Sequence, residues 1–299
     1  MSFRYAIEKN TVVETRRIAG EQVHKALAEI ADDSLDRHLV IHQVRKRCKK
    51  IRSLLRLVRG DLNGVYRQEN IRFRDIARML SGLRDAQASI DCLEGLREYA
   101  GKGEFEELYQ ALVLRRDAAV ADTEEIAAAL DGVSGRLADA QEPILEWPLE
   151  QDGFALLSRG MKKTYRRGRK ALHRAYENPN SNNFHDWRKR VKYHWYHTKL
   201  LQDIWPAMMG VRGKELKRLA DLLGDEHDLA VLEETLSRKP GEFGPAAALE
   251  DLLALLHRRQ QQLRSAARLL GKRIYAETAT AHVRRLEHLW AACRGPSGI

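Results

Sequence analysis

The sequence predicts an all-α fold built from two copies of one helical unit. The chain of 299 residues contains only 7 prolines and 20 glycines, while Ala, Leu, Glu, Arg and Lys predominate. These residues favour helices, and no run alternates polar and apolar side chains in the way that a half-buried strand does. In addition, one strongly basic helix pattern occurs twice, 143 residues apart. A repeat of this length indicates a duplicated structural unit.

Turn-forming residues divide the chain into about eight helical stretches. The predicted breaks lie at 31–34, 60–64, 101–103, 143–153, 178–183, 205–213 and 239–245. We interpret 143–153 as a linker between an N-terminal unit, 1–142, and a C-terminal unit, 154–299, each with four stretches. Asp32 or Ser34 can cap one helix, and Asn180 or Ser181 can cap its counterpart, because their side chains accept hydrogen bonds from a first helical turn.

The repeat is clearest in two segments, "IHQVRKRCKKIRSLLRLVRG" at 41–60 and "FHDWRKRVKYHWYHTKLLQD" at 184–203. Aligning His42 with His185 matches Arg45 with Arg188, Lys46 with Lys189, Arg47 with Arg190 and Lys49 with Lys192. The same register pairs Arg74 with Lys217, Ala77 with Ala220, Leu80 with Leu223, Asp85 with Asp228 and Leu93 with Leu236. A register kept over several helical stretches and their loops is difficult to explain by chance.

Each repeated segment separates cations from apolar residues. At 100° per residue, one face of roughly 120° carries cations on successive turns. In the first copy these are Arg45, Lys46, Lys49, Arg52 and Arg56, beside His42; in the second they are Arg188, Lys189, Lys192 and Lys199, beside His185. Arg47 and Arg190 lie at the edge of the apolar arcs and receive no role. The simplest interpretation is a surface exposed to solvent. Such surfaces usually carry charges of both signs, whereas the neighbouring cations here repel one another, and a bound polyanion would relieve that repulsion.

Composition restricts the compartment and the partners. The chain has 52 Lys and Arg against 42 Asp and Glu, a formal charge of +10. The three cysteines, Cys48, Cys92 and Cys293, are widely spaced, which argues against a disulfide framework or a zinc site and favours a reducing cytosol. The start of the chain lacks the apolar core of a signal peptide, and no apolar run is long enough to span a membrane. We therefore expect a cytoplasmic protein without a cofactor.

Several motifs together resemble the CHAD family, the conserved histidine α-helical domains. They are the His-x-x-Arg-x-x-x-Lys-Lys-x-Arg pattern from His42 to Arg52, "HDWRKRVK" at 185–192, "YRRGRKAL" at 165–172, and the pair "LSGLRD" and "LGDEHD" at 80–85 and 223–228. The resemblance implies two four-helix bundles related by a pseudo-twofold axis. It also implies a basic groove or channel that binds inorganic polyphosphate, association with polyphosphate granules, and no catalysis.

The resemblance assigns phosphate contacts to the repeated helices, with extra candidates on other helices. The first group comprises His42, Arg45, Lys49, Lys50, Arg52, His185, Arg188, Lys189 and Lys192, to which the helical faces add Lys46, Arg56 and Lys199. The second comprises Arg16, Arg17, Lys163, Arg166, Arg167, Lys170, Arg74 and Lys217. Tyr193 and Trp195 stand where the first copy has Lys50 and Arg52, so the two halves are not strictly symmetric. If His42 and His185 touch a polyanion, affinity should rise as pH falls through the histidine range.

Two other function classes stay open. Nucleic-acid binding fits the charge, and Trp187, Trp195 and Tyr196 could stack on bases. A metal-dependent phosphohydrolase could use His227 and Asp228, although their counterparts are Arg84 and Asp85, and Arg is no metal ligand. We therefore favour a structural role for Asp85 and Asp228 near Gly82 and Gly224.

His42 and His185 lack a second ligand at i+3 or i+4, so we expect no metal site. The oligomeric state and the preferred phosphate chain length stay open.

Overall fold

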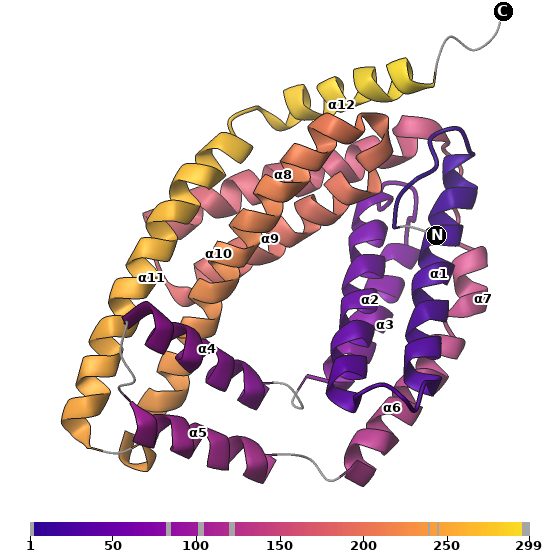
Figure 1. Ribbon diagram of the computed structural model, residues 1–299. Coiled ribbons are helices and arrows are strands. Elements are labelled where there is room, and N and C mark those ends of the chain that lie inside the picture. Colours follow the sequence, from indigo (N-terminus) through magenta and orange to yellow (C-terminus); the bar gives the residue numbers. More distant parts are fainter. Residues whose placement is uncertain are drawn as a thin grey trace, which may run out of the picture.

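The computed structural model describes residues 3–81, 85–100, 105–119, 123–238, 240–243 and 245–294 (Figure 1). Throughout these residues the chain forms helices joined by turns and loops, and they contain no strand. The all-α fold predicted from the sequence is therefore confirmed for the described part of the chain.

The N-terminal half begins with three helices that pack together, α1 (Thr11–Ala31), α2 (Arg37–Leu57) and α3 (Val65–Met79). The later helices of this half are α4 (Asp85–Ala100), α5 (Glu106–Ala119), α6 (Thr123–Ala138) and the short α7 (Gln141–Leu145). The cap of α2 is Asp36, whose side chain accepts a hydrogen bond from the Leu39 backbone N–H. The predicted caps Asp32 and Ser34 are wrong, because the helix begins only at Arg37.

The described part of the C-terminal half contains five α-helices. They are α8 (Gly153–Glu177), α9 (Ser181–Leu200), α10 (Pro206–Arg238), α11 (Ala246–Ile274) and α12 (Ala279–Cys293), with 3-10 turns at Gln202–Ile204 and Pro240–Glu242. The Asn180 side chain accepts from the Asn183 backbone N–H, so one of the two caps predicted for this helix is confirmed. The break predicted at 205–213 is wrong, because Pro206 opens α10 as a first-turn proline, and Gly210 and Gly213 lie inside the helix.

The two halves divide their helices differently. In the repeat register, the single helix α10 covers the positions of α3 and of the first part of α4, which are two separate helices in the N-terminal half. Likewise, α11 covers the positions of α5 and the first part of α6. In Figure 1, α4 and α5 lie beside the far parts of α10 and α11. A cluster of buried side chains, including Leu93, Leu112 and Leu252, joins these four helices across the halves.

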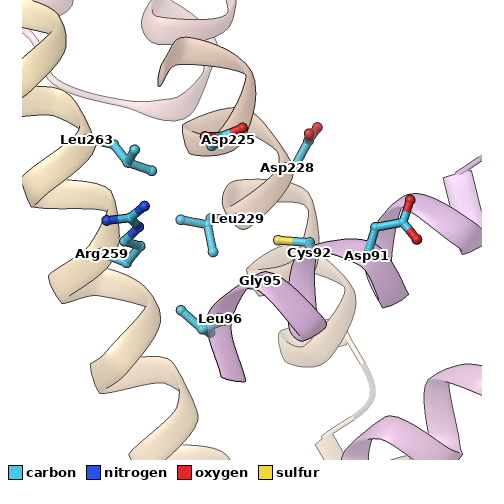
Figure 2. A pocket seen from close by; sticks show the side chains of 9 residues that line it. All are labelled: Asp91, Cys92, Gly95, Leu96, Asp225, Asp228, Leu229, Arg259 and Leu263. Atoms are coloured by element: carbon cyan, nitrogen blue, oxygen red, sulfur yellow. The ribbon is translucent and has the colours of Figure 1, made fainter. Parts of the chain in front are cut away.

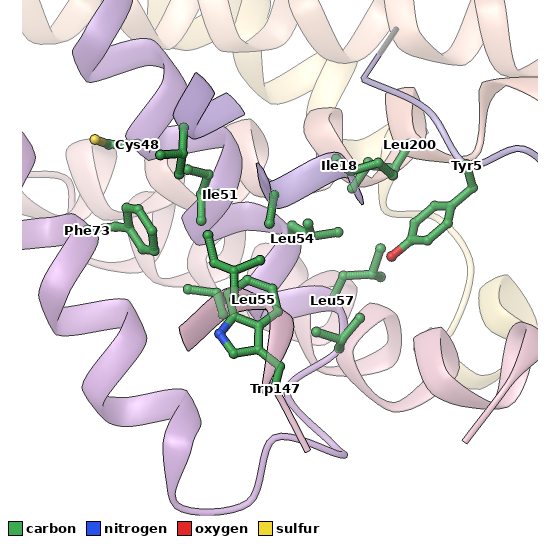
Figure 3. Packing of buried hydrophobic residues seen from close by; sticks show 14 of the residues in the cluster. Tyr5, Ile18, Cys48, Ile51, Leu54, Leu55, Leu57, Phe73, Trp147 and Leu200 are labelled. Carbon is green, nitrogen blue, oxygen red and sulfur yellow. The ribbon is translucent and has the colours of Figure 1, made fainter. Parts of the chain in front are cut away.

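The largest hydrophobic core contains residues from both sides of the predicted linker at 143–153 and from the linker itself. It contains α2 residues such as Leu54, Leu55 and Leu57, together with Trp147 and Leu200 (Figure 3). It also includes α8 and α12 side chains, among them Met161 and Trp290. A second core, formed by α8 to α11, surrounds the fully buried Trp187. The first core attaches the start of α8 and the end of α9 to α2.

Gly160 allows α8 to lie directly against α2. A Cβ atom at this position would be only 1.8 Å from the carbonyl oxygen of Leu57. No side chain could occupy that space without separating the helices, since real contacts of this kind are much longer. The contact brings the basic residues of α8 beside the C-terminal turn of α2.

Candidate anion-binding site

The two repeated helices, α2 and α9, cross each other. At the crossing, the imidazole Nε2 of His197 donates to the carbonyl oxygen of Ser53 over 2.9 Å, and the Ser53 hydroxyl donates to the Tyr193 carbonyl oxygen over 3.5 Å. The apolar residues of both helices, such as Cys48 of α2 and Val191 of α9, are buried. Because the apolar faces are buried, the cations of the two helices lie around the crossing, in two groups.

The first group, which we name the lysine cluster, consists of Lys46 and Lys50 of α2 and Lys192 and Lys199 of α9. The Lys50 ammonium lies 5.1 Å from the centre of the Phe3 ring, while the ammoniums of Lys192 and Lys199 each lie 4.5 Å from the Trp195 ring. These rings hold the lysines in place through cation–π contacts.

The lysine ammoniums are partly buried beside other cations. Burial, followed by the charges of Arg47, Lys46 and Lys199, lowers the pKa of Lys50 to about 8. Burial and then Arg188 lower the pKa of Lys192 to about 8, although Asp221 opposes this shift. The pKa of Lys199 is lowered mainly by burial and then by Lys46. The cluster therefore carries unfavourable charge that an added anion would stabilise.

The second group, which we name the arginine cluster, consists of Arg56 in the last turn of α2, Arg59 just beyond that helix, Lys163 and Arg167 of α8, and Arg190 of α9. The Arg56 guanidinium lies 4.0 Å from the Tyr193 ring centre, and that of Arg59 lies 4.4 Å from the Tyr66 ring. Arg190 donates to both carboxylate oxygens of Asp186, at 3.2 and 3.3 Å.

Mutual repulsion connects the members of the arginine cluster. Burial lowers the pKa of Arg167, with Arg190 and Arg59 as the next causes. The pKa of Lys163 is lowered by burial and then by Arg59 and Arg167. Burial also lowers the pKa of Arg56, and Arg190 contributes in the same direction against the opposing effect of Tyr193. The five cations thus share one electrostatic environment.

The two histidines that head the motifs lie at the N-terminal parts of α2 and α9. His42 is half-buried, one turn before Lys46. The ring of His185 lies 3.9 Å from the ring of His227, centre to centre. Burial, followed by His227, Lys189 and Arg188, lowers the pKa of His185 to about 4. His185 is therefore neutral near pH 7 in the protein without a ligand, and the rise in affinity expected at falling pH stays a prediction.

Arg45 and Arg188 face the helices that follow theirs in the chain. The Arg45 guanidinium donates to the carbonyl oxygen of Ala77 in α3 over 3.1 Å. The Arg188 side chain lies against α10, where a Cβ at Gly224 would be 3.5 Å from its Nε. That Nε is buried and has no hydrogen-bond partner among the described residues. Arg188 therefore offers an unsatisfied donor next to Lys192.

Other predicted residues are engaged with nearby acids or lie at the surface. Arg17 donates to Glu14 and Glu21, Arg74 is paired with Asp75, and Lys217 is paired with Asp221. Arg16 donates to the Trp147 carbonyl oxygen, and Arg52 donates to Asn70. Lys49, Lys189, Arg166 and Lys170 are exposed. Lys217 nevertheless contributes to the lowered pKa of Lys192 and Lys199, so it borders the lysine cluster. Arg166 and Arg52 act in the same way on Lys163 and Arg56 of the arginine cluster.

Sequence reasoning missed four contributors, Arg59, Arg190, Tyr66 and Phe3. Arg59 follows Arg56 by three residues, so helical spacing could have placed both on one side of α2. The part played by the rings of Tyr66 and Phe3 had no sequence signal, because it depends on how the chain packs around α2.

A pocket of about 330 Å³ lies between α4, α10 and α11 (Figure 2). Its acidic lining residues are Asp91, Asp225 and Asp228, and burial, followed by the Asp228 charge, raises the pKa of Asp225. Within the described ranges, no three His, Cys, Asp or Glu residues are arranged to hold a metal ion. Arg84 and the Asp85 side chain, the counterparts of His227 and Asp228, lie outside the described residues.

The family model described as the CHAD domain matches residues 17–237, a range that contains α2, α9 and both clusters. No curated protein matches the chain. Among the helices that the structure describes, none combines the length and apolar composition needed to cross a membrane.

Proposed function

Because the chain belongs to the CHAD domain family, we propose that it binds inorganic polyphosphate through the cations around the crossing of α2 and α9. The observation that carries the proposal is the lysine cluster, in which Lys50, Lys192 and Lys199 are partly buried beside one another and beside further cations. A polyphosphate chain carries charge along its whole length, so it can pair with several of these ammoniums at once.

The proposal includes a pseudo-twofold arrangement of two four-helix bundles. In the repeat register, Lys50 corresponds to Tyr193, and Arg56 corresponds to Lys199. Lys50 and Lys199 interact electrostatically in the lysine cluster, while Tyr193 and Arg56 contact each other in the arginine cluster. Matching positions thus meet on both sides of the crossing, which supports a twofold relation even though the outer helices are divided differently.

Burial of the aromatic rings favours polyphosphate over nucleic acid. Stacking on bases requires an exposed ring face. Trp187 is fully buried, Trp195 and Tyr196 are 9% and 5% exposed, and Lys192 and Lys199 already lie against the Trp195 ring. The remaining argument for nucleic acid is net charge, which supports binding to any polyanion.

The proposal assigns binding without catalysis. The residues that form the two clusters are cations, and they supply no paired nucleophile and base to cleave a phosphoanhydride bond. The family membership and the widely spaced cysteines favour a cytoplasmic location at polyphosphate granules.

Charge reversal tests the proposal. We expect the double variant Lys50→Glu and Lys199→Glu to bind long-chain polyphosphate at least a hundredfold more weakly, because each charge-assisted contact contributes roughly 1.5–3 kcal/mol. The matched control is Arg258→Glu with Arg284→Glu, which makes the same charge change at exposed positions on α11 and α12. Calorimetric titration measures affinity, and circular dichroism verifies that both variants are helical. An equal loss in the control would show that overall charge, rather than this site, determines binding.

A further inference from the structure

We propose that the arginine cluster is by itself a binding site for a short condensed phosphate of two or three phosphoryl groups, and that the lysine cluster is needed only for longer chains. This inference rests on the proposed function for its ligand class, since both clusters are assigned condensed phosphate. It adds that the two sides of the α2–α9 crossing are chemically different sites.

The backbone contact at Gly160 assembles the arginine cluster. Lys163 and Arg167 follow Gly160 by three and seven residues, so they lie on the face of α8 that meets α2. The neighbouring Arg159 side chain packs against Gly60, where a Cβ would be 2.9 Å from its Cδ. The last turn of α2 and the first half of α8 therefore present their cations to the same volume.

Aromatic rings and hydrogen bonds hold the guanidiniums before any ligand arrives. Arg56 lies against Tyr193 and donates to the carbonyl oxygen of Arg52 over 2.7 Å, which uses one of its five N–H groups. Arg59 lies against the Tyr66 ring. Ordering these long side chains in advance lowers the entropy lost on binding.

The charge of the cluster fits a compact anion with several charges. The electrostatic neighbours of Lys163 are all arginines, namely Arg59, Arg167, Arg166 and Arg159. Asp186 is the carboxylate that opposes the shift of Arg167, and it is already engaged by Arg190. Guanidiniums stay protonated when partly desolvated, and their planar forks match the oxygens of phosphoryl groups.

The lysine cluster has no equivalent of this arrangement. In the repeat register, Arg59, Lys163 and Arg167 correspond to Gln202, Gly20 and His24. On α1, the helix that corresponds to α8, Glu14 and Glu21 engage Arg17. The members of the lysine cluster are ammoniums, each a point charge, and the one unsatisfied guanidinium described beside them, that of Arg188, lies against Gly224 of α10. Such a surface suits a chain that passes over it more than a short anion that needs several donors at once.

Inorganic triphosphate is the probe that tests this inference. We expect Arg59→Gln with Arg167→Gln to weaken triphosphate binding at least tenfold, while Lys50→Gln with Lys199→Gln and the control Arg258→Gln with Arg284→Gln change it less than threefold. Arg59→Lys with Arg167→Lys keeps the charge but removes the forks, so we expect it to bind triphosphate about fivefold to tenfold more weakly than the wild type. Circular dichroism and urea unfolding verify that each variant folds.

Long-chain polyphosphate, titrated in parallel, separates the two proposals. Wild-type protein that binds the long chain but not triphosphate would overturn the inference and leave the proposed function standing. Protein that binds triphosphate but not the long chain would overturn the proposed function, and with it the role of the lysine cluster, but would leave the triphosphate site at the arginine cluster standing. Equal loss of triphosphate affinity in the lysine and arginine pairs would show one shared site and would also overturn the inference.

Discussion

Replacing Lys50 by Met should stabilise the folded protein and weaken polyphosphate binding at the same time. The Lys50 ammonium lies over the Phe3 ring, and burial together with Arg47, Lys46 and Lys199 lowers its pKa from 10.5 to about 8. Methionine is also long and flexible, so it keeps the contact with the ring while removing the charge.

The size and sign of the stability change follow from that pKa. One pKa unit corresponds to about 1.4 kcal/mol, so the shift of Lys50 sets an upper limit near 3 kcal/mol. Because the ammonium is partly exposed, solvent screening reduces this to about 1–2 kcal/mol. The folded pKa lies below the unfolded one, so the destabilisation is complete below pH 8 and disappears as pH rises from 8 to 10.5. Wild-type stability should rise across this window.

Urea unfolding at pH 7 and pH 10, followed by circular dichroism, measures the effect. We expect Lys50→Met to raise the free energy of unfolding by about 1–2 kcal/mol at pH 7, with a smaller difference at pH 10. The exposed control, Lys214→Met, should change it by less than about 0.5 kcal/mol. Calorimetry should show polyphosphate affinity about tenfold lower for Lys50→Met. A destabilised Lys50→Met protein, or one with unchanged polyphosphate affinity, would refute the reasoning.

Three further perturbations probe the helix contact, the buried histidines and the lysines. Gly160→Ala should lower the free energy of unfolding by about 3 kcal/mol, because its Cβ meets the Leu57 carbonyl, whereas Gly135→Ala, with open space, should raise it by about 0.5–1 kcal/mol in the same urea assay. Burial lowers the pKa of His197 to about 4, so the free energy of unfolding should fall as pH drops from 6.5 towards 4. In urea titrations at several pH values, the free energy of unfolding should change less with pH for His197→Gln than for the wild type. Polyphosphate affinity, measured by calorimetry, should decrease as pH rises through 8, where Lys192 loses its proton.

Local sequence patterns predicted those features of the helices that depend on residues close together in the chain. The Asn180 cap and the all-α content follow from short-range preferences. The chain breaks at 201–205 instead of 205–213, because Pro206 opens α10, and Gly210 and Gly213 are tolerated inside a helix that packs against α9 and α11. Glu14 and Glu21 lie three and four residues from Arg17, so the sequence did contain the signal that this arginine is engaged.

The candidate site was predictable only one helix at a time. Periodicity placed Lys46 and Lys199 on the basic faces of separate helices, and the family resemblance added Lys50. The proximity of Lys50 and Lys199 depends on how α2 and α9 cross. The same limit applies to Arg59 and Lys163, which meet because Gly160 lets α8 touch α2. The pKa of His185 also needed the structure, since it depends on burial and on the His227 ring.

Competition between polyanions tests the central claim most directly. Labelled long-chain polyphosphate bound to the wild-type protein is displaced by unlabelled polyphosphate or by duplex DNA at equal total charge, and the chain length of the polyphosphate is measured afterwards. The arrangement of ammoniums on α2 and α9 predicts that polyphosphate competes at a charge concentration at least about tenfold lower than DNA, and that its chain length is unchanged. Equal competition by DNA, or shortened polyphosphate, would contradict a protein that binds polyphosphate selectively and without catalysis.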